Sequence, residues 1–150
     1  MSKNKALVVG ATGIVGLNLS NLLNEQADWA AYGLARRLSL PQGIHGIAAD
    51  LLDPEALRIA LDEVHPTHVF LTTWSRQPTE AENIKVNAAM VRSLLDALSS
   101  AGSVEHVALV TGLKHYLGPF EAYGKGNLPA SVSRGPATAR PRELLLCSGR

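Results

Sequence analysis

The sequence predicts an α/β fold built on a doubly wound parallel sheet, and three observations favour this class. Between Lys5 and Gly126, short apolar or β-branched runs alternate with longer amphipathic stretches, the pattern of successive strand–helix–strand units. The chain has 150 residues, about one domain, and 46% of them are hydrophobic against 18% charged, enough to form a core. A glycine-rich turn directly follows the first apolar run. We expect the N-terminal half of such a sheet.

The expected elements alternate along the chain. The strands are expected at residues 6–9, 29–35, 44–48, 69–73 and 107–111. The helices are expected over 14–24, from residue 54 onward, and over 80–99. Asp53 and Pro54 mark the start of the second helix, because aspartate caps helix N-termini and proline suits the first helical position. Gly102 marks the end of the third.

Charge and composition exclude several classes of partner. The net charge of +1 is too small for a typical nucleic-acid or membrane-surface binder. No run approaches the roughly 20 apolar residues of a membrane span, and no export signal is recognisable, so a cytoplasmic location is expected. Cys147 is the single cysteine, and the histidines show no paired ligand spacing. We therefore expect no metal site and no internal disulfide.

The turn after the first strand has the spacing of a dinucleotide-binding loop. Gly10 permits a tight turn, Gly13 lets backbone N–H groups approach a pyrophosphate, and Gly16 lets the helix lie close to the strand. This position in a strand–turn–helix unit predicts a Rossmann-type domain. The alternative is a Rossmann-like fold that binds nothing. The residues expected to hold the pyrophosphate are Gly10, Thr12, Gly13, Ile14, Val15 and Gly16.

The end of the second strand indicates which nicotinamide cofactor is used. Arg36 and Arg37 follow it with no acid nearby, which favours NADPH, because guanidinium groups bind the oxygens of a 2′-phosphate bidentately. Two solvated loop arginines are the alternative. Asp50 and Leu51 follow the third strand and are expected at the adenine, although Asp50 is equally suited to cap the next helix.

Four segments together resemble one family. The loop GATGIVG, the strand end GLARR, the segment HVFLTTW and the run TGLKHYLGPFEAYGKG are similar to the progesterone 5β-reductase and iridoid synthase-like enone reductases, which are atypical extended short-chain dehydrogenases/reductases. The resemblance covers about residues 5–126. It implies an NADPH-dependent enzyme that delivers hydride to the β-carbon of a small enone, and it allows a homodimer of the full-length enzyme.

The resemblance also implies site residues. The chain has no Tyr-x-x-x-Lys pair, and the family likewise takes its lysine from the run that matches Lys114. Lys114 is therefore the expected catalytic residue, with a solvated loop lysine as the alternative. His115 and Tyr116 are expected as supports for its loop, with acid/base roles as the alternative. Thr72, Thr73 and Trp74 are expected to line the cofactor's ribose and the substrate entrance. A packing role is the alternative for Trp74.

The tail, residues 127–150, differs from the rest. It holds four arginines against Glu143 alone and loses all periodicity, so no stable element is expected there. The family's catalytic tyrosine belongs near position 146, where the chain has leucine. Codons permitted from Ser131 onward, read one nucleotide later, can spell the family's missing segment in register. The tail is therefore compatible with out-of-frame translation, by a frameshift or a sequencing error.

Two other functions remain open at this point. One is an NAD-dependent extended dehydrogenase such as a nucleotide-sugar epimerase or dehydratase, against which the missing Tyr-x-x-x-Lys pair and the two arginines count. The other is a non-catalytic NADP(H)-binding module, which is what the chain as written amounts to without its tyrosine. We also expect a truncated sheet to be marginally stable, because its edge and part of its core lack cover.

Overall fold

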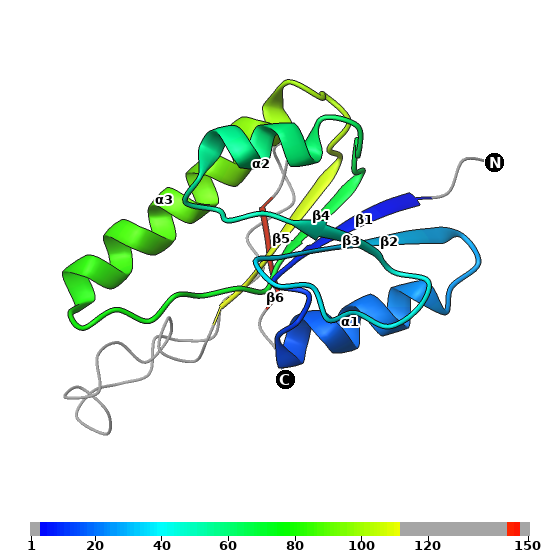
Figure 1. Ribbon diagram of the computed structural model, residues 1–150, viewed down its shortest axis with the longest axis horizontal. Helices are drawn as coiled ribbons and strands as arrows, with labels where there is room; N and C mark the ends of the chain where they lie inside the picture. Colours follow the sequence, from blue (N-terminus) through cyan, green and yellow to red (C-terminus); the bar gives the residue numbers. More distant parts are fainter. Residues whose placement is uncertain (1–3, 112–143, 148–150) are drawn as a thin grey trace, which may run out of the picture.

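The computed structural model describes residues 4–111 and 144–147, which form one parallel sheet with helices on both faces (Figure 1). The strands lie in the order β3-β2-β1-β4-β5-β6, and every neighbouring pair is parallel. In chain order the elements are β1 (Asn4–Val9), α1 (Ile14–Asn24), β2 (Trp29–Ala35), β3 (His45–Ala48), α2 (Pro54–Leu61), β4 (His68–Leu71), α3 (Glu80–Ser99), β5 (His106–Val110) and β6 (Leu144–Cys147). This is the doubly wound parallel sheet that the sequence predicts.

The sheet separates two hydrophobic clusters. Helix α1 covers one face, and α2 and α3 lie together on the other (Figure 1). Strand β1 contributes to both, because successive residues of a strand point to opposite faces. Ala6 and Val8 pack on the α1 side, whereas Leu7 and Val9 pack beneath α2 and α3, and all four are fully buried. Residues 6–9 of this central parallel strand are therefore continuously apolar.

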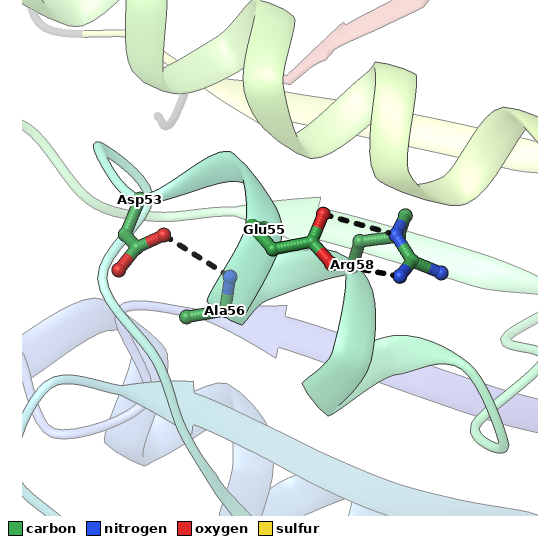
Figure 2. Close-up of polar contacts among 4 residues, drawn as sticks. All are labelled: Asp53, Glu55, Ala56 and Arg58. Atoms are coloured by element: carbon green, nitrogen blue, oxygen red, sulfur yellow. Dashed lines mark hydrogen bonds and ion pairs between the residues drawn. The ribbon is translucent and has the colours of Figure 1, made fainter.

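Helix α2 begins where the sequence predicts. Asp53 accepts a hydrogen bond from the backbone N–H of Ala56 at 3.1 Å, and Pro54 occupies the first turn (Figure 2). Glu55 forms an ion pair with Arg58 one turn later, at 2.9 Å, on the exposed side of the helix. The opposite side of α2 packs into the larger cluster. The N-terminal cap and the apolar face of α2 thus both indicate a helix at this position.

Helix α3 is fixed at both ends by local signals. Thr79 accepts from the backbone N–H of Glu82, while the Glu82 carboxylate accepts from the N–H of Thr79, which makes a capping box. Gly102 follows the helix with φ of +60°, a conformation that glycine adopts without strain. The predicted bounds of 80–99 are confirmed.

The tail contains a strand that the sequence did not predict. Residues 144–147 pair in parallel with β5, in the register Val107↔Leu144 to Val110↔Cys147. The expectation of no stable element is therefore wrong over these four residues, and the sheet of the described residues has six strands rather than five. The open edge of β5 offers unpaired backbone groups that an apolar run such as Leu144-Leu145-Leu146 can satisfy without any periodic pattern.

Candidate cofactor site

A cleft of about 710 Å³ opens at the carboxyl ends of β1, β2, β3 and β4. Strand β2, the next in the chain, lies on one side of β1, and β4 lies on the other side. The cleft is therefore at the point where the strand order reverses. Open α/β sheets hold their ligands at this position. The residues that line it are Val9, Gly10, Thr12, Gly13, Leu34, Ala35, Arg36, Arg37, Ala49, Asp50, Leu51, Leu52, Thr72, Thr73, Trp74, Ser75 and Met90.

The glycine turn has the geometry that the sequence predicts. Gly10 has φ of +86°, and a Cβ there would lie 2.8 Å from the Cβ of Thr73. A Cβ on Gly16 would collide with the backbone oxygen of Gly10 and lie 2.7 Å from the hydroxyl of Thr72. Side chains at these two positions would push the turn away from β4 and α1 away from β1. Glycine is required at both positions for close packing.

Helix α1 points its N-terminus toward the turn without a side-chain cap. Gly13 occupies the N-cap position and offers no side-chain acceptor. The first N–H groups of a helix have no partner within the helix, so those of Ile14 and Val15 are suited to an anion. The side chain of Ile14 is 86% exposed. Ile14, Val15 and Gly16 do not line the cleft, whereas Gly10, Thr12 and Gly13 do.

Backbone hydrogen bonds bring the arginine pair to the same cleft. The N–H groups of Gly10 and Ala11 both donate to the carbonyl oxygen of Leu34, at 2.9 and 3.2 Å. This contact joins the glycine turn to the end of β2, so that Arg36 and Arg37 line the cleft beside it. Both side chains are exposed, and no carboxylate within residues 4–111 forms an ion pair with either. Two guanidinium groups are therefore available to a ligand anion.

Asp50 and Leu51 also line the cleft. One carboxylate oxygen of Asp50 accepts the backbone N–H of Leu52 at 2.9 Å. The helix that follows is capped by Asp53 instead, so the alternative role of Asp50 as its cap is wrong. The N–H of Ala49 donates to the oxygen of Ala35 at 3.3 Å, which holds the end of β3 against the end of β2. Asp50 and the arginines consequently share one end of the cleft.

The segment after β4 closes the other end. The strand ends at Leu71, two residues earlier than predicted, and the next three residues line the cleft. The hydroxyl of Thr72 donates to the oxygen of Val9 at 2.8 Å, so it ties β4 to β1. The Trp74 side chain is 60% exposed, which disfavours the packing alternative. Trp74 instead forms part of the rim.

Sequence reasoning missed seven residues that line the cleft. They are Val9, Leu34, Ala35, Ala49, Leu52, Ser75 and Met90. Most of them lie next to a predicted site residue near the end of a strand. Their closeness in sequence to those residues was the signal that could have identified them. Met90 lies on α3, where its apolar spacing resembles that of a core residue. Lys114, His115 and Tyr116, and the side chain at position 146, lie outside the described residues.

Within the described ranges, no three His, Cys, Asp or Glu side chains gather closely enough to hold a metal ion. Within the same ranges, no helix has the length and apolar character needed to cross a membrane.

The sheet order, the glycine turn and the cleft at the reversal point define a Rossmann-type nucleotide-binding domain. The sequence model of the NAD dependent epimerase/dehydratase family matches residues 6–141. The chain belongs to this family.

Curated relatives confirm the resemblance to enone reductases that the sequence motifs predict. The chain is 38% identical over 130 residues to an (S)-8-oxocitronellyl enol synthase of Camptotheca acuminata, covering 80% of this chain and 33% of that protein. It is 40% identical over 125 residues to the 3-oxo-Delta(4,5)-steroid 5-beta-reductase of Arabidopsis thaliana, covering 77% and 32%. The chain thus spans about a third of the length of these relatives.

Solved structures share the fold. A short-chain dehydrogenase/reductase superfamily protein from Agrobacterium tumefaciens with bound NAD is 27% identical, with a TM-score of 0.62 over 75% of this chain and 34% of that one. The UDP-glucose 4-epimerase of Brucella ovis in complex with NAD is 23% identical, with a TM-score of 0.63 over 75% and 37%.

Proposed function

We propose that the chain is the cofactor-binding part of an NADPH-dependent reductase of activated C=C bonds in enones. The observation that carries the cofactor choice is the position of Arg36 and Arg37, both unpaired within residues 4–111, at the end of the cleft next to Asp50. A 2′-phosphate at this end of a dinucleotide is the anion that two adjacent guanidinium groups bind best. The names of the two curated relatives support the reaction class.

The residues of the cleft fit a dinucleotide. The turn leaves no room for a Cβ at Gly10, and one on Gly13 would lie only 3.3 Å from the oxygen of Gly10. Backbone N–H groups at this turn and at the start of α1 are therefore accessible to a pyrophosphate. The free oxygen of Asp50 is suited to accept a hydrogen bond from the adenine amino group. Thr73 and Trp74 then border the nicotinamide end.

When bound, NADPH supplies the hydride. The protein's task is then to stabilise the negative charge that develops on the carbonyl oxygen of the enone. Lys114, four residues beyond the end of β5, is the proposed cation for this oxygen. No tyrosine follows Tyr123, so the proton donor that the resemblance implies is absent from the chain as written. We therefore propose that residues 127–150 are an out-of-frame reading of a longer reductase.

Cofactor titration tests the proposal. The double variant Arg36→Ala/Arg37→Ala should weaken NADPH binding by on the order of 1.5–3 kcal/mol, because it removes charge-assisted hydrogen bonds, and should change NADH binding far less. Arg92→Ala is the matched control, since this exposed arginine lies on α3 and does not line the cleft.

Equal losses for the two cofactors in the double variant would contradict the assignment of the arginines. Tighter binding of NADH than of NADPH by the unaltered chain would instead favour an NAD-dependent epimerase or dehydratase. Binding of NADPH without turnover by the frame-restored protein would favour a non-catalytic binding module.

A further inference from the structure

The segment between β4 and α3 is held by a side chain of α3. The Oδ1 atom of Asn87 accepts the backbone N–H of Ser75 at 2.8 Å, and its Nδ2 donates to the backbone oxygen of the same residue at 2.8 Å. One amide thus satisfies both backbone groups of Ser75. This two-point contact replaces the pairing that Ser75 would have in a strand, and it fixes the path of the chain after Trp74.

A second amide holds the same segment one helical turn away. The Oδ1 atom of Asn83 accepts the backbone N–H of Gln77 at 2.6 Å. The side chain of Gln77 donates back to the hydroxyl of Ser75 at 2.9 Å. Asn83 and Asn87 are four residues apart and therefore lie on one face of α3. Asn87 also donates to the backbone oxygen of Asn83 at 2.8 Å.

The helix that carries these amides is itself firmly anchored. Leu94 and Leu98 are buried in the larger cluster, with exposed fractions of 0% and 3%. The capping box at Thr79 and Glu82 fixes its first turn. The two asparagines therefore extend from a rigid element to a segment that has no regular structure of its own.

The segment in question forms part of the cleft. Trp74 and Ser75 both line it, and Met90, one turn beyond Asn87 on α3, lines it as well. Trp74 is largely exposed and so has little packing of its own to fix its position. Without the amide contacts, the segment would have the mobility usual for an exposed loop with few buried contacts.

We infer that Asn87, assisted by Asn83, is a positioning residue that holds Ser75–Gln77 and thereby fixes Trp74 at the rim of the cofactor cleft. Its importance for cofactor binding rests on the function proposed above. The effect on Trp74 does not, because it concerns the shape of the cleft in the free protein. A purely structural role for Asn87 would instead be limited to the stability of α3.

The chain offers a direct readout, because Trp29 and Trp74 are its two tryptophans. In a Trp29→Phe background, fluorescence reports on Trp74 alone. We would measure quenching of Trp74 by acrylamide, hydrogen exchange at the N–H groups of Ser75 and Gln77, and NADPH affinity by titration. The variants are Asn87→Ala, Asn83→Ala and Asn87→Asp. The matched control is Asn24→Ala, since Asn24 also holds a loop oxygen, that of Gln42, but does not line the cleft.

We expect Asn87→Ala to accelerate exchange at Ser75 about tenfold, the factor expected for loss of roughly one net hydrogen bond. Quenching of Trp74 should rise, and NADPH affinity should fall several-fold. Asn83→Ala should accelerate exchange at Gln77. Asn87→Asp keeps the acceptor and loses the donor. The N–H of Ser75 should therefore stay protected from exchange, and quenching of Trp74 should lie between that of the unaltered chain and that of Asn87→Ala. Asn24→Ala should leave all three measurements unchanged.

Unchanged exchange at Ser75 and unchanged quenching of Trp74 in Asn87→Ala would overturn the inference, whatever happens to cofactor affinity. If the unaltered chain binds no NADPH, the proposed function falls, and exchange and quenching still decide the role of Asn87. If Asn87→Ala does not fold, Asn83→Ala and Asn87→Asp provide the same comparison with smaller changes.

Discussion

Thr72 shows how a single hydroxyl sets the geometry of the cleft. Its Oγ1 donates to the oxygen of Val9, and its backbone N–H donates to the same oxygen at 2.9 Å. These contacts hold the end of β4 against the last residue of β1, where the glycine turn begins. The resemblance predicts Thr72 as a residue facing the cofactor. The structure gives its hydroxyl a second task, which sequence alone does not reveal because its partner is a backbone atom 63 residues away.

At the opposite end of the sheet, three rings lie in a row. His68 and His106 are register partners on β4 and β5, with ring centroids 4.8 Å apart, and Trp29 of β2 contacts His68 at the same distance. Burial lowers the pKa of His68 below its usual 6.5, and the neighbouring His106 lowers it further, while Glu105 opposes the shift. Linear spacing hides this pair, since strand register brings the two histidines together.

This arrangement predicts a stability loss on acidification. Because the pKa of His68 is lower in the folded state than the unfolded value of about 6.5, the unfolded chain binds more protons in this window. The free energy of unfolding should therefore fall as pH drops below about 6.5, through the lowered folded pKa. Urea unfolding between pH 7.5 and 5 measures it. His68→Gln should flatten the dependence, whereas His65→Gln, on an exposed residue, should not. An unaltered dependence in His68→Gln would assign the loss to other groups.

Among the elements, α2 depends on its cap. Asp53→Ala should lower the free energy of unfolding by about 1 kcal/mol, the usual effect of removing an N-cap acceptor. Asp53→Asn keeps an acceptor for the N–H of Ala56 and should recover most of the loss. Arg58→Ala breaks the neighbouring exposed ion pair and should have a smaller effect. Urea denaturation of the three variants is the measurement. A larger loss in Arg58→Ala than in Asp53→Ala would contradict this ranking.

Elements with strong local signals were predictable from the sequence. The bounds of β2 and α3 were predicted correctly, because both combine clear apolar patterns with defined ends. Strand β6 was not, since its pairing depends on the open edge of β5 rather than on any pattern of its own. The same distinction applies to the cleft. Glycines and arginines at strand ends were predictable, whereas Met90 lines the cleft, and Asn87 contacts Ser75, only through tertiary packing.

At the scale of the whole molecule, the chain spans about a third of the length of its curated relatives. As written, it should reduce 2-cyclohexen-1-one with NADPH at no more than a trace rate, because leucine at position 146 donates no proton. Restoring the reading frame from about residue 127 and continuing to the full length should give NADPH-dependent activity. Lys114→Ala in the restored enzyme should lower its rate by on the order of 10²–10³, the usual effect of removing one group that stabilises an oxyanion.

Lys85→Ala is the control for the lysine, because this exposed residue of α3 does not line the cleft. Full activity of the 150-residue chain would show that the active site lies elsewhere. Resequencing the gene across the codons for Gly126 to Ser133 tests the frame itself, and an unshifted reading there would refute the proposed origin of the tail.

The central position of β1 has a consequence for how the chain acquires its structure. Strand β1 pairs with β2 after one short helix, but its other edge pairs only with β4, much later in the chain. The Lys5–Thr67 hydrogen bond, for example, joins residues 62 positions apart. A ribosome that has released only the first two strands has therefore exposed a strand with the apolar run 6–9 and one edge unpaired. Such non-local closure slows folding and leaves the nascent chain open to misassociation until β4 emerges. The strand that forms the centre of the finished sheet is, during synthesis, its most vulnerable edge.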